Sequence, residues 1–181
     1  VTQDPTPAGE SFTYYVKVDG DALAEGFTWE TATTLATAME KSADGDKICV
    51  AAGTYTPISL IPGGETEEER TFEIHSNFTI EGGYPADAAT GAVADPTNNE
   101  TIFDGVGSAY HVVVVSASKD NTPAVLRNVT ITGGRSHTVN QQTYRQAGEN
   151  LVDVGMGGGL YIGKANFIME NCKVIANAAT L

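Results

Sequence analysis

A few acidic and basic residues of this chain are of the types that polysaccharide cleavage requires. The candidates are three aspartates and two bases: Asp87, Asp95, Asp104, Arg127 and His111. A polysaccharide lyase needs a base beside carboxylates that hold Ca²⁺, because the cation acidifies the proton next to a uronate. The spacing of these five residues matches no motif, and an isolated Asp more often bonds the backbone of its own turn. We therefore assign no catalytic residue.

Other kinds of reactive site are not indicated. Glycoside hydrolysis needs two carboxylates, and the motifs NTD, DD and GHG are absent from the sequence. His75, His111 and His137 show no ligand spacing, so we expect no metal site. Cys49 and Cys172 form no CxxC motif and are interpreted as small packed hydrophobes. The glycine-rich GMGGGLYIG lacks the nucleotide-binding patterns, so no cofactor is expected.

Two aromatic residues could offer a flat face to a sugar ring. We expect Trp29 to be buried beneath the N-terminal part of the fold. Tyr84 opens the polar segment 84–100, which also contains Asp87. These two residues are the candidate ligand contacts. The sequence does not identify the ligand.

Composition and charge restrict the class of protein. The chain of 181 residues is 41% hydrophobic and has 20 glycines, which favours a folded, mostly β domain. The net charge is −13, and residues 1–100 hold 18 acidic and 4 basic side chains. Such a field repels nucleic acids and anionic membranes. No stretch of about 18 apolar residues could span a membrane, so we expect neither nucleic-acid binding nor membrane insertion.

The elements that would position these residues begin after a polar leader, 1–13, which we interpret as a tether. A strand is predicted from Tyr14. Apolar residues then repeat at helical spacing and predict one short amphipathic helix: Ala32, Leu35, Ala36 and Met39. Gly45 is the expected left-handed residue after this helix, and ICVAAGTY is the expected buried strand that follows it.

An internal repeat organises the remainder of the chain. Three segments align, each with Asn followed by alternating apolar residues: 77–83, 128–134 and 171–177. We expect Ile80, Ile131 and Val174 to form one interior column. Further short apolar runs before each segment predict about three strands per repeat. The polar segments 84–100 and 135–156 are expected to project as long loops.

The asparagines that open the three segments have two interpretations. Asn77 and Asn128 begin N-x-T glycosylation signals, as does Asn99. The repeat instead places Asn77, Asn128 and Asn171 in one column, where Asn tolerates a left-handed backbone and can bond its equivalent in the next repeat. We therefore predict a structural asparagine ladder.

These patterns resemble a known family. The residues that carry the resemblance are YYVKVDG, GDKICVAAGTY, FTIEGGYP, YHVVVV, VTITGG and GGGLYI with VIANAA. Their order resembles the right-handed parallel β-helix repeat proteins of bacterial cell surfaces, in the pectate-lyase-like superfamily. GGGL at 157–160 and VIAN at 174–177 resemble the GGA(I/L/V) and FxxN repeats of chlamydial polymorphic outer-membrane proteins, with Gly159 and Val174 as departures.

The resemblance implies an all-β, right-handed parallel β-helix over residues 14–181. It implies an N-terminal cap with a short helix at about 14–47, followed by the first coils, with further coils missing after Leu181. An uncapped C-terminal end could self-associate. The expected function is a non-enzymatic secreted or surface module, adhesin-like, that presents loops to a glycan or to a protein on a host or neighbouring cell. A polysaccharide lyase-type enzyme is the alternative.

Overall fold

The computed structural model describes residues 10–117, 122–137 and 144–180, and it shows a mostly β protein with one α-helix. Three parallel sheets carry most of the strands. Sheet 1 contains, in spatial order, β1 (Thr13–Val16), β2 (Lys47–Ala51), β5 (Thr79–Tyr84), β8 (Ala124–Arg127) and β14 (Phe167–Glu170). Sheet 2 contains β3 (Gly53–Tyr55), β6 (Thr101–Asp104), β9 (Val129–Thr132) and β15 (Lys173–Val174). Sheet 3 contains β4 (Phe72–Ile74), β7 (Val113–Val115) and β13 (Leu160–Ile162).

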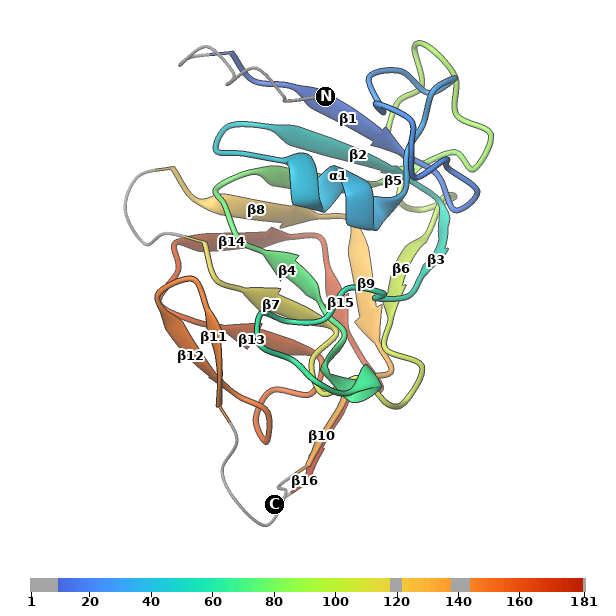
Figure 1. Ribbon diagram of the computed structural model, residues 1–181. Helices are drawn as coiled ribbons and strands as arrows, with labels where there is room; N and C mark the ends of the chain where they lie inside the picture. Colours follow the sequence, from blue (N-terminus) through green and yellow to red (C-terminus); the bar gives the residue numbers. More distant parts are fainter. Residues whose placement is uncertain (1–9, 118–121, 138–143, 181) are drawn as a thin grey trace.

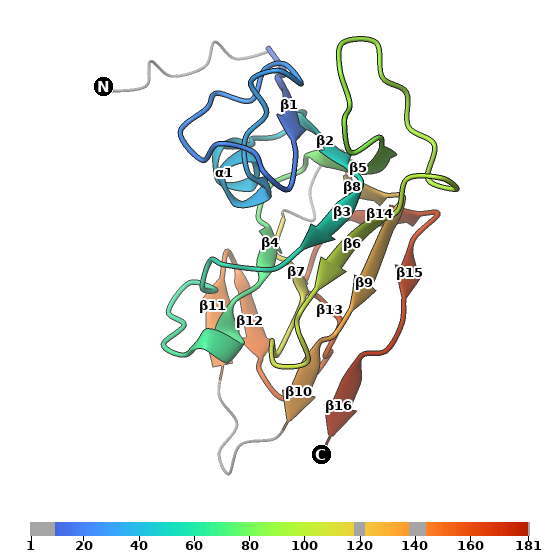
Figure 2. The same ribbon diagram turned by 90° about the vertical axis from the view of Figure 1, so that its right-hand side faces the viewer.

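Two smaller pairings complete the described strands. β10 (Arg135–His137) pairs in parallel with β16 (Ala178–Thr180) and extends the side of the molecule formed by sheet 2, as Figure 2 shows. β11 (Tyr144–Ala147) and β12 (Asn150–Asp153) form an antiparallel hairpin.

The chain visits the three large sheets in rotation. It runs through β2, β3 and β4, then through β5, β6 and β7, and it returns to sheets 1 and 2 with β8 and β9. After the hairpin it passes through β13, β14 and β15. In Figure 1 the strands of sheet 1 are stacked from β1 near the N-terminus to β14, so each passage lies on the previous one.

The core lies between the sheets because alternate residues of each strand point inward. In sheet 1 the register aligns Ile48 with Ile80 and Ile80 with Leu126, and all three side chains are fully buried. In sheet 2, Phe103 and Ile131 are aligned and equally buried. Aligned apolar rows of this kind bury side chains that a single strand could not cover alone.

The predicted interior column is wrong for its first segment. Ile80 lies in sheet 1 and pairs with Leu126, whereas Ile131 lies in sheet 2 and pairs with Phe103 and Val174. Segments 128–134 and 171–177 are therefore equivalent, but segment 77–83 is not. All three share the same local alternation, which is set by the strand and does not specify the neighbouring strand.

One short helix covers the N-terminal end of the core. Helix α1 (Leu35–Lys41) buries Leu35, Ala38 and Met39, and Figure 1 shows it beside β1, β2 and β4. The Thr34 side chain caps its start by accepting a hydrogen bond from the Thr37 N–H at 3.2 Å. The predicted helix is thus present, although Ala32 lies outside it.

The ends of the predicted cap also differ in detail. Residues 1–9 of the predicted leader lie outside the described residues. Phe12, which the leader also included, is tied to the fold because its N–H donates to Asp46 Oδ1 at 2.7 Å and its carbonyl accepts from Lys47 N–H. Gly45 adopts a φ of 89°, but it lies in the turn beyond the helix.

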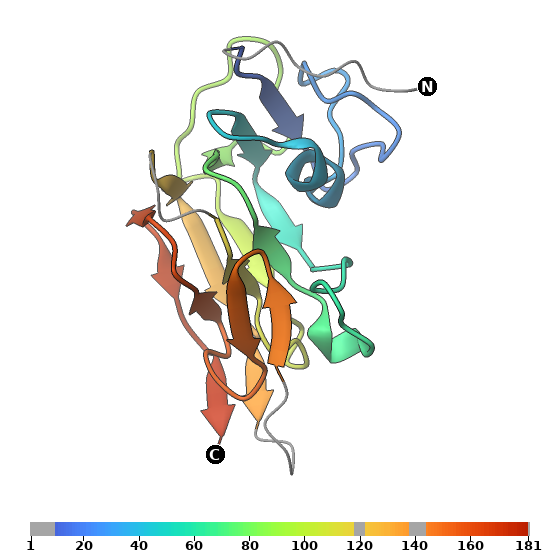
Figure 3. The same ribbon diagram turned by 60° about the vertical axis from the view of Figure 1, so that its left-hand side comes forward.

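Each of the two long polar segments contributes apolar residues to a small cluster outside the main core. Ala88, Ala92 and Ala94 of the first segment pack against Trp29 and its neighbours. The second segment contains the β11–β12 hairpin, which packs through Ala147 and Val152 on the outer side of sheet 3, as Figure 3 shows. The first segment still projects as a long loop, as predicted and as Figure 2 shows, although its alanines pack at the base, whereas the hairpin of the second segment lies against sheet 3.

Candidate functional site

The five residues considered for polysaccharide cleavage do not share a site in the structure. Asp104 Oδ1 accepts a hydrogen bond from the Val106 N–H at 2.8 Å, and Asp95 bonds the N–H of Thr97 in its own loop. Arg127 forms a salt bridge with Glu170. These are the roles of turn-forming aspartates and of a paired surface cation. Asp87 is exposed.

His111 is also engaged elsewhere. Its ring is buried, Nδ1 lies 3.1 Å from the Gly157 carbonyl oxygen, and the ring contacts Tyr161. Burial lowers the pKa of His111, so the ring stays neutral at physiological pH. The histidine therefore supports the packing of the hairpin region.

The predicted ligand contacts, Tyr84 and Asp87, do not form an open sugar platform. The Tyr84 ring is only 8% exposed, and it packs against Trp29 with ring centroids 5.2 Å apart. The Tyr84 hydroxyl donates to Glu81 Oε2 at 2.8 Å. Burial of the Tyr84 face leaves no flat surface for a pyranose ring. Trp29 is buried, as expected.

A shallow recess of about 500 Å³ lies above these aromatic rings. Lys47 lines the recess, and its Nζ lies 2.6 Å from a Glu81 carboxylate oxygen. Burial lowers the pKa of Lys47, but the hydrogen bond to Glu81 and the charges of Cys49 and Glu81 together outweigh this effect, and the net shift is upward. Burial raises the pKa of the Cys49 thiol, so this sulfur is not an activated nucleophile. The charged lining residue of the recess, Lys47, is therefore already paired.

The asparagine column is present only in part. Asn171 Nδ2 donates to Asn128 Oδ1 at 2.9 Å, and Asn128 Nδ2 donates to the Gly82 carbonyl at 3.2 Å. Both asparagines have a left-handed backbone, with φ of 50° and 58°. Gly82 occupies the equivalent place in the preceding passage, where an added Cβ would lie 2.6 Å from the Asn128 carbonyl oxygen. Asn77 lies before β5, and the register of β5 with β8 places Gly82 beside Asn128 instead. The inclusion of Asn77 in the ladder is therefore wrong.

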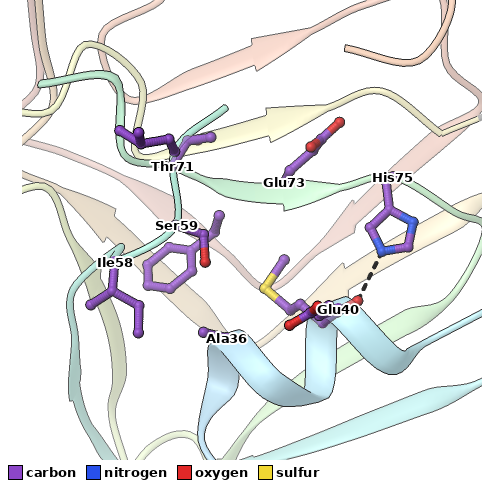
Figure 4. A pocket seen from close by; sticks show the side chains of 10 residues that line it. Ala36, Glu40, Ile58, Ser59, Thr71, Glu73 and His75 are labelled. Carbon is purple, nitrogen blue, oxygen red and sulfur yellow. Dashed lines mark hydrogen bonds between the residues drawn. The ribbon is translucent and has the colours of Figure 1, made fainter. Parts of the chain in front are cut away.

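Sequence analysis missed a partly apolar groove on the surface of the protein. It has a volume of about 360 Å³ and lies between α1, the extended segment 58–60 and strand β4. Figure 4 shows the side chains that line it. The groove-lining residues are Ala36, Met39, Glu40, Ile58, Ser59, Leu60, Thr71, Phe72, Glu73 and His75. A concave apolar surface with a few polar groups is the usual form of a binding site.

The floor of this groove and part of its wall are apolar. Met39 and Phe72 are each 4% exposed and belong to the main core, which fixes their positions. Ile58 and Leu60 are 62% and 45% exposed on the wall. These two aliphatic side chains offer apolar surface that a partner could cover. The signal in the sequence is the run PISLIP, in which Ile58 and Leu60 alternate with polar or buried positions.

The polar groups of the groove are held in fixed positions. His75 Nε2 lies 2.9 Å from the Met39 carbonyl oxygen, the contact dashed in Figure 4, and Nδ1 lies 2.9 Å from Ser76 Oγ. Glu73 Oε1 accepts a hydrogen bond from Ser116 Oγ at 2.5 Å. Both ring nitrogens of His75 are thus engaged, so the ring is poorly placed to exchange a proton with a ligand.

Neither metal ligation nor membrane crossing is indicated by the part of the chain that the structure describes. Within residues 10–117, 122–137 and 144–180, no group of three or more His, Cys, Asp or Glu side chains could hold a metal ion. The one described α-helix is too short to cross a bilayer. The chain matches no known protein family, no curated protein and no solved structure.

Proposed function

We propose that the three sheets form a right-handed parallel β-helix of the pectate-lyase-like type, with α1 as its N-terminal cap. The support is the rotation of the chain through sheets 1, 2 and 3 and the parallel register of every pair within them. The sequence resemblance points the same way. A crystal structure tests the proposal, and a left-handed winding of the coils would overturn it.

We further propose that the protein is a non-enzymatic, adhesin-like module of a secreted or cell-surface bacterial protein, which binds a glycan or a protein. The observation that carries this proposal is the groove beside α1. Its apolar floor is rigid, its walls expose Ile58 and Leu60, and the imidazole of His75 is committed to structural hydrogen bonds. This arrangement offers contact area to a partner and no free acid–base pair.

A binding experiment and an enzyme assay together test this function. The purified chain is screened on a glycan array and on an array of short peptides, and it is incubated with uronate-containing polysaccharides while ultraviolet absorbance is followed. We expect a saturable array signal and a flat absorbance trace. An increase in absorbance from unsaturated products would replace the proposal with the lyase alternative.

The proposed location has its own test. Antibodies against the chain should label intact source cells or the culture medium, as expected for a surface or secreted module. Labelling that requires cell permeabilisation would overturn the location.

A further inference from the structure

We propose that the groove between α1, segment 58–60 and β4 docks an extended peptide segment in which an aliphatic residue is flanked by Lys or Arg. This inference rests on the proposed binding function and names the partner for one site. The anchor would fill the space above Met39 and Phe72. The cations would lie against the carboxylates at the rim.

The size and lining of the groove suit one or two aliphatic side chains. A volume of about 360 Å³ is at the lower end of the range for ligand pockets. The floor belongs to the main core, so the groove is formed before a partner arrives. Covering Ile58 and Leu60 would remove the apolar surface that makes the wall unfavourable in water.

The free edge of sheet 3 can hold the main chain of such a peptide. Among the described strands, β4 is the last of this sheet and pairs with β7 alone, while the residues just before it are already paired on the outer edge, since Thr71 N–H donates to the Ser59 carbonyl. The free part of the edge is therefore short and centred on Glu73. Phe72 N–H and Ile74 C=O bond to the β7 side, at Val112 and Ser116. In a parallel ladder the intervening residue, Glu73, then directs its N–H and C=O to the opposite edge, which borders the groove. Extended peptides commonly bind by pairing with such an edge.

The charge of the rim selects the peptide. Glu40 and Glu73 line the groove, no Lys or Arg is among the lining residues, and neither carboxylate forms a salt bridge with a described residue. The surrounding N-terminal part of the chain is strongly acidic, with 18 acidic and 4 basic residues in positions 1–100. Cationic flanks are therefore attracted and acidic peptides are repelled.

The test is a binding titration with two fluorescent probes. One is a short acetylated peptide in which Lys alternates with Leu, and the other is its counterpart with Glu in place of Lys. We expect the Lys peptide to bind the full chain at low ionic strength and to saturate at one peptide per chain. Its affinity should fall as NaCl is added. The Glu peptide should not bind. Equal binding of the two peptides would overturn the charge selection.

Matched variants localise the binding. The double substitution of Ile58→Ser and Leu60→Ser should weaken binding of the Lys peptide about tenfold, which corresponds to about 1.4 kcal/mol. Val93→Ser, at an exposed position on the loop 84–100 that contributes no residue to the groove, should leave binding unchanged. Glu40→Lys should also weaken binding about tenfold, with Glu149→Lys, at an exposed position between β11 and β12, as the control.

The outcomes separate this inference from the proposed function. If the groove and control variants bind the Lys peptide equally, the groove is not the docking site, and the inference fails. If the chain binds a glycan on the array and the groove variants abolish that signal, the partner class is wrong while the binding function stands. If neither array gives a signal, both proposals fail.

Discussion

At the scale of single residues, Asn128 supports the turn between sheets 1 and 2 in two separate ways. Its backbone is left-handed, with φ of 58°, and its side chain links Gly82 to Asn171. Asn tolerates this backbone better than other non-glycine residues. The two contributions can be separated because Gly keeps the backbone and removes the side chain.

We predict that Asn128→Ala lowers the free energy of unfolding by about 2 kcal/mol, from strain and lost hydrogen bonds. Asn128→Gly should cost about 1 kcal/mol, because only the hydrogen bonds are lost. Urea denaturation of the three proteins measures both values. An Ala variant as stable as the original chain would show that neither contribution matters.

His111 makes stability depend on pH. Burial lowers the pKa of its imidazole in the folded state, so the unfolded chain binds the proton more readily. Asp153 acts in the opposite direction but does not reverse the shift. The contribution of His111 is therefore complete above its ordinary pKa of 6.5 and is lost as the pH falls through the lower, folded-state pKa.

We predict that the melting temperature falls from neutral pH to about pH 5 and that His111→Phe makes this fall shallower. The variant loses the bond to Gly157, so its stability at neutral pH is lower. His137→Gln, at an exposed position, serves as the control and should keep the full pH dependence. Identical slopes for all three proteins would exclude His111 as the cause.

At the scale of elements, one carboxylate joins the hairpin to the body. Glu69 is the last residue of the 3₁₀ helix η1 (Glu67–Glu69), and its Oε2 accepts from the N–H of Glu65 and of Thr66 at 2.8 and 3.1 Å. The same side chain bonds Arg145 on β11, with Nη2 at 3.2 Å. Burial raises the pKa of Glu69, but the hydrogen bonds from Arg145, Glu65 and Thr66 together lower it by more than burial raises it. The net shift is downward and keeps the carboxylate ionised.

We predict that Arg145→Leu destabilises the protein by roughly 2–3 kcal/mol, because it leaves the buried Glu69 carboxylate without its cation. Hydrogen exchange should increase in β11 and β12. Arg70→Leu is the matched control, since its salt bridge with Glu67 is exposed at both ends. That variant should change stability by less than about 0.5 kcal/mol. Equal losses in the two variants would contradict the role of Glu69.

At the scale of the whole molecule, the face formed by β13, β14 and β15 leaves large apolar side chains exposed. Val174 aligns with buried Ile131 and is 47% exposed, and Met169 aligns with buried Leu126. This face is nearly neutral, because residues 160–181 hold two Lys and one Glu in a chain of net charge −13. We propose that two copies associate through this face, where strand edges and apolar rows are both available.

We predict a concentration-dependent dimer in sedimentation velocity. The double substitution of Ile162→Lys and Val174→Lys should shift the chain to monomer, since each inserts a charge into the apolar face. Val93→Lys, on the loop 84–100, is the control and should leave the dimer intact. A strictly monomeric original chain at high concentration would refute the proposal.

Much of the local structure could be predicted from the sequence. The short apolar runs in ICVA, FEI, VVV and AVL predict strands, and the spacing of Leu35 and Met39 predicts a helix, because each pattern is confined to a few residues. The turn roles of Asp95 and Asp104 also follow from residue type. None of these inferences requires knowledge of distant parts of the chain.

The tertiary structure decided which strands are neighbours and where a ligand could bind. Ile80 and Ile131 have the same local pattern, yet loop lengths and side-chain packing place them in different sheets. The groove joins Met39, Ile58 and Phe72, three residues from separate elements whose proximity no local pattern encodes. Period and residue type are properties of a short segment, whereas strand order and concave surfaces depend on the packing of segments far apart in the chain.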